Sequence, residues 1–179
     1  MPKIKPISLG SANPHQKKLL EGLKAKMGRI PAIYATIAHS PTTLEAMLTY
    51  NESLKKGTLS PKEIEAVALA VGQTNDCGYC VAAHTMLGKM AGLSVEETLE
   101  CRRGKAHDPK LDALVKLASE IVKTRGLPSA KTLADFRAAG YSDGSIVEVI
   151  AWTTYNIFTN YFNHIAETVS DFPNAPELI

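Results

Sequence analysis

The stretch Glu63–His84, EIEAVALAVGQTNDCGYCVAAH, joins a small, apolar helical run to two cysteines three residues apart, and a histidine follows four residues after the second cysteine. Glu65 interrupts the apolar run. The chain has one further cysteine, Cys101, which we interpret as a small buried hydrophobe. Two thiols this close together can bind a metal ion or form a redox pair, and one of them can be a nucleophile with the histidine as its base.

Helix signals occur on both sides of this junction. Ser60 is a predicted N-cap, with Pro61 at the first helical position and Glu63 at the capping-box position. Ser94 and Glu97 repeat the capping-box pattern after the cysteines. A helix running from about Gly78 to Ala91 is therefore expected between two other helices, with the cysteine pair at its start.

The length and the periodicity predict the fold class. A chain of 179 residues is long enough for one well-buried core and short for two domains. Few stretches alternate with a period of two, so no sheet is expected. We predict a single all-α domain over residues 1–179, with the motif core at about 40–125. Residues 1–12 are expected to form a loosely ordered arm.

The composition narrows the classes of function. Apolar residues make up 45% and charged residues 21%, close to the average of globular domains, and the net charge is only +2. No nucleic-acid partner is therefore predicted. No apolar run approaches the roughly 18 residues that cross a bilayer, and the first residues do not resemble a signal peptide. We expect a cytoplasmic protein that does not bind a membrane, in which a close thiol pair is catalytic, redox-sensing or metal-binding.

The spacing of the polar residues suggests a site. If a helix begins at Gly78, then Cys77, Cys80 and His84 lie along one stripe of it. Cys80 and His84 are four residues apart, so their side chains can meet and His84 can act as the base. Cys77 lies at the helix entrance, where free N–H groups favour a thiolate. One helical turn also brings the two Cα atoms within disulfide distance.

Glu65 is predicted to point toward the core, because it shares a helix face with small and apolar residues, among them Ala68 and Gly72. A buried carboxylate without a partner is unfavourable. His84 would satisfy it, and the carboxylate would hold the imidazole in one tautomer. The alternative is an ordinary first-turn acid that interacts only with the helix dipole.

The cysteine pair has three other interpretations. The pair could simply be two small core residues. A zinc site would need Cys101 or His107 as a further ligand, at spacings unlike those of common zinc modules. Covalent haem is excluded because Val81, rather than a histidine, directly follows the second cysteine. A redox-active dithiol is the interpretation that the pattern favours.

The spacing Glu65-x11-Cys77-x2-Cys80-x3-His84 resembles the AhpD-like alkylhydroperoxidases of the carboxymuconolactone decarboxylase superfamily. Asn75 and Tyr79, in the pattern N-x-C-x-Y-C, and the GLS of residues 92–94 extend the resemblance. The segment NYFNHIAETVSDFP, residues 160–173, is similar to the peroxidase-related branch of that superfamily. The specific motif covers about 62–104.

The resemblance implies an all-helical, homo-oligomeric peroxidase that uses no haem, metal or other cofactor. Cys80 would attack the hydroperoxide and Cys77 would close the disulfide, which an external dithiol would reduce. His84 and Glu65 would form the relay that deprotonates Cys80. In one respect the chain departs from the pattern: well-known members carry a second histidine where Tyr79 stands here.

Two rival functions follow from the same residues. His84 and Glu65 could act as acid and base on a small lactone, as in the decarboxylases of the superfamily, although those generally lack the cysteine pair. The protein could instead be a non-catalytic redox sensor or a zinc-binding protein. Because of the cysteine pair, we expect redox chemistry.

Overall fold

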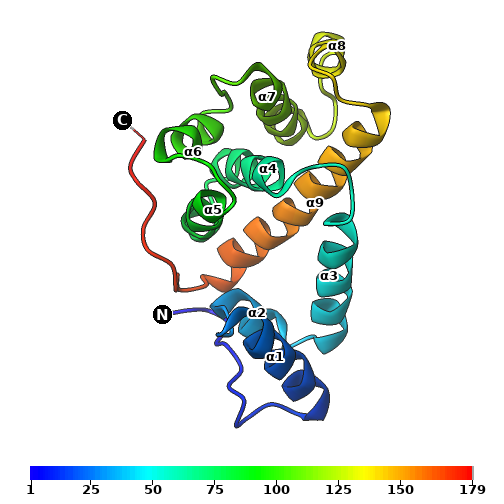
Figure 1. Ribbon diagram of the computed structural model, residues 1–179. Helices are drawn as coiled ribbons and strands as arrows, with labels where there is room; N and C mark the ends of the chain where they lie inside the picture. Colours follow the sequence, from blue (N-terminus) through cyan, green and yellow to red (C-terminus); the bar gives the residue numbers. More distant parts are fainter. Residues whose placement is uncertain (179) are drawn as a thin grey trace.

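Helix α4 (Pro61–Thr74) lies at the centre of the fold and is buried along most of its length. It contacts α5, α6, α7 and α9, because its side chains are small enough for several helices to pack around it (Figure 1). The computed structural model describes residues 1–178, and these form helices without strands. The other helices are α1 (Pro14–Met27), α2 (Ala32–Ile37), α3 (Pro41–Leu54), α5 (Gly78–Met90), α6 (Val95–Arg102), α7 (Pro109–Thr124), α8 (Ala130–Ala138) and α9 (Asp143–Ala166). The predicted all-α fold is confirmed.

The helix boundaries near the cysteines follow the predicted caps. The Ser60 side chain accepts from the Glu63 amide, and the Glu63 carboxylate accepts from the Ser60 amide. Ser94 and Glu97 form the same reciprocal pair at the start of α6. These caps satisfy N–H groups that have no partner within their own helix. The predictions for the starts of α4, α5 and α6 are confirmed.

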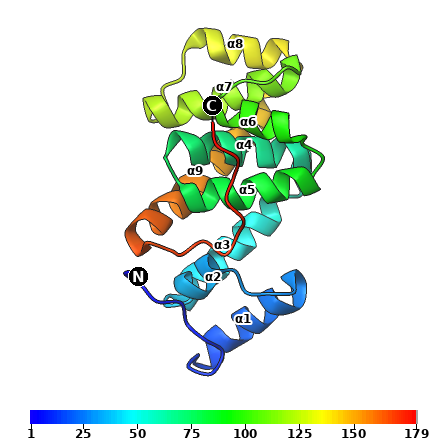
Figure 2. The same ribbon diagram turned by 90° about the vertical axis from the view of Figure 1, so that its left-hand side faces the viewer.

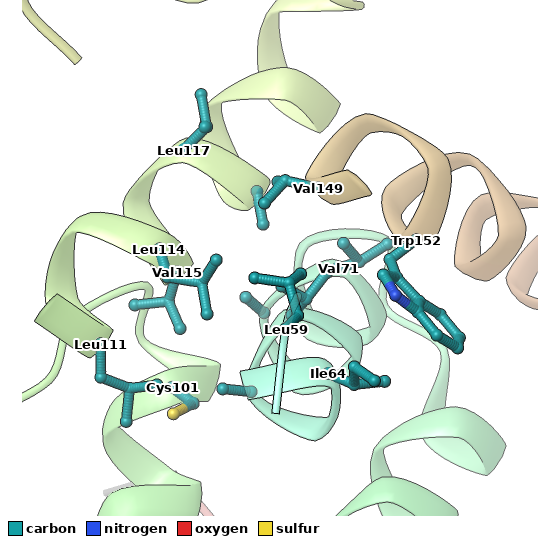
Figure 3. Packing of buried hydrophobic residues seen from close by; sticks show 14 of the residues in the cluster. Leu59, Ile64, Val71, Cys101, Leu111, Leu114, Val115, Leu117, Val149 and Trp152 are labelled. Atoms are coloured by element: carbon teal, nitrogen blue, oxygen red, sulfur yellow. The ribbon is translucent and has the colours of Figure 1, made fainter. Parts of the chain in front are cut away.

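The apolar side chains form two clusters. The larger one packs α4 against α7 and α9, with Val71, Leu114 and Val149 among its fully buried members (Figure 3). The smaller one joins α1, α2 and α3 to the start of α5, and it includes both Cys77 and Cys80. The two cysteines therefore belong to the smaller cluster, to which α4 contributes no residue.

Two glycines lie where α4 and α5 pack against each other. A Cβ atom on Gly88 would lie 2.9 Å from Leu93 Cδ1 and 3.7 Å from the Cβ atom of Glu65. A Cβ atom on Gly72 would lie 3.4 Å from that of Cys80. The glycine at position 88 thus leaves room for the Leu93 side chain, whereas a Cβ atom at position 72 would make an ordinary contact with Cys80.

The two chain ends pack against the helices. In the N-terminal arm, the Lys3 amide donates to the carbonyl of Ala166 and the Ile7 amide to the carbonyl of Ala35. The C-terminal segment, residues 168–178, runs past α5 and α6 (Figures 1 and 2).

Exposed apolar side chains lie along α9, including Val147, Phe158 and Ile165. That the chain assembles as a homo-oligomer stays a prediction.

Among residues 1–178, no helix is both long and apolar enough to span a bilayer.

The packing around α4 gives a direct stability prediction. Leu114 is fully buried against this helix, so Leu114→Ala should lower the free energy of unfolding by about 2–5 kcal/mol, because it leaves a cavity. Leu127→Ala, at an exposed leucine, should change it by less than about 0.5 kcal/mol. Urea unfolding measures both, and equal losses would contradict the assignment of Leu114 to the core.

Candidate active site

The two cysteines lie at the start of α5 and are joined in a disulfide, with their Cα atoms 5.3 Å apart. Cys77 is the N-cap of the helix, and its sulfur accepts the backbone N–H of Cys80 at 3.3 Å. Cys77 is 1% exposed and Cys80 is 3% exposed. The pair is thus a buried disulfide at a helix N-terminus, an environment that favours thiolates after reduction.

Glu65 on α4 and His84 on α5 form the predicted pair. Nδ1 of His84 lies 2.7 Å from Oε2 of Glu65, and both side chains are mostly buried. Because a carboxylate can only accept, Nδ1 donates the proton, and in the neutral imidazole Nε2 is left as a proton acceptor. The carboxylate thereby fixes the tautomer that a general base requires.

A cavity of about 230 Å³ connects these residues. Cys80, His84 and Glu65 all line it, whereas Cys77 does not. Much of the remaining wall is apolar or aromatic, with Ile33 and Phe172 among its members. The cavity therefore offers a small, largely apolar organic molecule access to one thiol of the pair and to the neighbouring histidine.

Asn163 on α9 is a polar contact that the sequence analysis did not single out. Its Nδ2 donates to the sulfur of Cys80 at 3.3 Å, and it lies 3.9 Å from that of Cys77. The residue is 5% exposed, and its Oδ1 has no hydrogen-bond partner within the described chain. The sequence does carry a sign of a polar site on this helix. The spacing of Asn156, Asn160 and Asn163 places three amides on one face of a largely apolar helix.

Tyr79 occupies the position where the sequence departs from the family pattern. Its hydroxyl donates to Oδ1 of Asp171 at 2.8 Å and accepts the Ile33 amide at 3.4 Å, and its ring meets Phe172 edge-on. Burial, together with the bond to Asp171, raises the pKa of Tyr79, so the phenol stays protonated. This side chain anchors the C-terminal segment and does not take the place of a second basic histidine.

The residues required for the zinc interpretation are not brought to the cysteine pair. Cys101 lies in the larger apolar cluster, where burial raises its pKa to about 12. His107 is exposed and pairs with Glu100 at 3.0 Å. Within residues 1–178, no three His, Cys, Asp or Glu side chains are grouped closely enough to hold a metal ion.

Comparisons with known proteins agree with this fold. Residues 41–119 match the carboxymuconolactone decarboxylase family. The structure is similar to that of an uncharacterized peroxidase-related protein from Ralstonia eutropha JMP134, described as an alkylhydroperoxidase AhpD core, with a TM-score of 0.85 and 20% identity over 95% of this chain and 92% of the other. No curated protein sequence matches the chain.

Two further solved structures share the fold. One is an uncharacterized peroxidase-related protein from Silicibacter sp. TM1040, with a TM-score of 0.81 and 18% identity over 99% of this chain and 97% of the other. The other is the debrominase Bmp8 in complex with 2,3,4-tribromopyrrole, with a TM-score of 0.79 and 13% identity over 94% and 91%. The same helical arrangement is therefore found in proteins described by different activities.

Proposed function

We propose that this chain, which has a match to the carboxymuconolactone decarboxylase family over residues 41–119, is a thiol-dependent peroxidase that reduces organic hydroperoxides. The observation that carries the proposal is that Cys80, His84 and Glu65 line one cavity, with His84 hydrogen-bonded to Glu65 and Cys80 joined to Cys77 in a disulfide. A buried thiol pair beside an oriented imidazole is the arrangement that activated cysteine chemistry requires.

The reaction begins with the reduced pair. Nε2 of His84 accepts the proton of the Cys80 thiol, and the thiolate attacks the terminal oxygen of the hydroperoxide. A sulfur–oxygen bond forms as the oxygen–oxygen bond breaks, and the sulfur supplies the two electrons. The leaving alkoxide takes the proton from His84 and departs as an alcohol, so that Cys80 remains as a sulfenic acid.

Cys77 then resolves the sulfenic acid. Its sulfur attacks that of Cys80, the sulfur–sulfur bond forms, and water leaves. The disulfide of the structure represents this oxidised state. An external dithiol must return two electrons and two protons before the next cycle.

The structure also supports the choice of Cys80 as the attacking thiol. The sequence leaves two opposing arguments, since the helix dipole favours Cys77 and the nearby base favours Cys80. Cys80 lines the cavity together with His84, and Cys77 does not. We therefore assign the attack on the hydroperoxide to Cys80, which shares the cavity with His84.

Asn163 acts as a positioning residue in this scheme. Its N–H, which donates to the Cys80 sulfur in the disulfide, would stabilise the thiolate after reduction. The amide would thus act on the sulfur that attacks the hydroperoxide.

Counting thiols tests the proposal. One equivalent of tert-butyl hydroperoxide should remove two thiols from the reduced protein. Cys77→Ser should accumulate a sulfenic acid at Cys80, and Cys80→Ser should remain largely inert. Cys101→Ser is the matched control and should react like the wild type, because Cys101 lies outside the cavity.

Three outcomes would favour other functions. Equal, slow oxidation of all variants would mean that the thiols are not activated. Full activity of Cys80→Ser on a small lactone, without peroxide consumption, would favour acid–base catalysis. Oxidation without repeated turnover in the presence of a dithiol would favour a redox sensor.

Asn163→Ala should slow the oxidation of Cys80 by about tenfold or more, since a hydrogen bond to a charged group contributes roughly 1.5–3 kcal/mol. The rate should also reach its plateau at higher pH, because the thiolate is less stabilised. Asn160→Ala is the control, since that buried side chain bonds Asn75 and not the sulfurs. Stopped-flow oxidation across pH measures both effects. An unchanged pH profile would contradict the thiolate contact.

A further inference from the structure

The two cysteines of the disulfide border different hollows. Cys80 lines the inner cavity described above, and Cys77 lines a second hollow of about 450 Å³, which we call the outer groove. The outer groove is formed by the end of α4, the start of α5, Arg102 of α6 and part of the C-terminal segment 168–178. No residue lines both hollows.

The C-terminal segment separates the two hollows. Phe172 belongs to the wall of the inner cavity, whereas Ser170 and Asn174, on either side of it in sequence, line the outer groove. The segment crosses α5 near its start and continues past α6 (Figure 2). A molecule in one hollow is therefore kept from the other by the chain itself.

Specific contacts hold this segment in place. Asp171 bonds Nη1 of Arg29 at 2.9 Å, the Ala32 amide at 3.1 Å and the Tyr79 hydroxyl at 2.8 Å. Farther along, Nη1 of Arg102 donates to the carbonyl of Pro176. The partition is thus built by charged and polar contacts at both ends of the crossing.

We propose that the outer groove is the access route of the reductant, a dithiol of low molecular weight, and that it attacks Cys77. This inference rests on the proposed peroxidase function. Peroxide and reductant would then reach the two sulfurs from opposite sides. The product alcohol in the inner cavity would not have to leave before reduction begins.

The dithiol reduces the disulfide in two exchange steps. One thiolate of the dithiol bonds to the Cys77 sulfur, the Cys77–Cys80 bond breaks, and Cys80 leaves as a thiolate beside the Asn163 N–H. The second thiol of the reductant then attacks its own mixed-disulfide sulfur and releases Cys77. The reductant becomes a disulfide, and its two electrons and two protons pass to the cysteines.

The burial of Cys77 determines the size class of the reductant. Its side chain is only 1% exposed, between the first turn of α5 and the C-terminal segment. A thiol on a slender carbon chain can enter such a groove. A cysteine held in the backbone of a folded protein would require the C-terminal segment to move away.

The two half-reactions can be measured separately. Gly78 is exposed beside Cys77 in the outer groove, and a Cβ atom there meets nothing within 4 Å. Gly78→Phe should therefore obstruct the groove without disturbing the fold. Ala83→Leu is the matched variant, because Ala83 lines only the inner cavity.

Gly78→Phe should slow reduction of the disulfide by dithiothreitol about tenfold or more, since exchange depends on access to the sulfur, and leave oxidation by tert-butyl hydroperoxide within about twofold of the wild type. Ala83→Leu should show the opposite pattern. The proposal is overturned if Gly78→Phe slows neither half-reaction or both equally, or if Ala83→Leu slows reduction as much. Gly78→Ala, with a smaller side chain, should have an intermediate effect on reduction.

Two controls keep the outcomes distinct. If hydroperoxide does not oxidise the reduced wild type, the proposed function fails, while the reduction assay still tests the outer groove. A thioredoxin-type protein should reduce the wild type more slowly than dithiothreitol at equal dithiol concentration. Faster reduction by that protein would overturn the size class.

Discussion

The hydrogen bond between Glu65 and His84 is the contact on which the proposed chemistry depends, because it links α4, at the centre of the fold, to α5, which carries the cysteines. It requires the two helices to lie close together, and Gly72 and Gly88 lie where they pack. It also fixes which imidazole nitrogen is free to take a proton. One contact thus relates the packing of the core to the chemistry proposed for Cys80.

The dithiol lies between two environments that serve different purposes. Cys80 borders the aromatic inner cavity together with His84, and Cys77 borders the more polar outer groove. The C-terminal segment, held through Asp171 by Arg29 and Tyr79, separates them. Tyr79 stands where the motif of similar proteins has a second histidine. It has a structural role in this chain, because its hydroxyl holds the C-terminal segment through Asp171.

Features encoded locally could be predicted from the sequence. The caps at Ser60 and Ser94 and the start of the thiol helix follow from short-range hydrogen bonds and periodicity. The Glu65–His84 contact could be predicted because a carboxylate on an apolar face requires a partner. Contacts with distant segments could not be predicted in this way. Asn163 meets the cysteines across 83 residues or more, and Asp171 meets Tyr79 across 92, so only the packed fold brings them together.

The most direct test of the central claim is a double-mutant cycle on Glu65 and His84, read as the rate at which hydroperoxide oxidises the reduced protein. We predict that His84→Gln slows oxidation by about a hundredfold or more, as expected for loss of a general base, and that Glu65→Gln alone also slows it. In the His84→Gln background, Glu65→Gln should have no further effect, since the carboxylate acts through the imidazole. Independent, multiplying effects of the two substitutions, or no effect of either, would contradict the account.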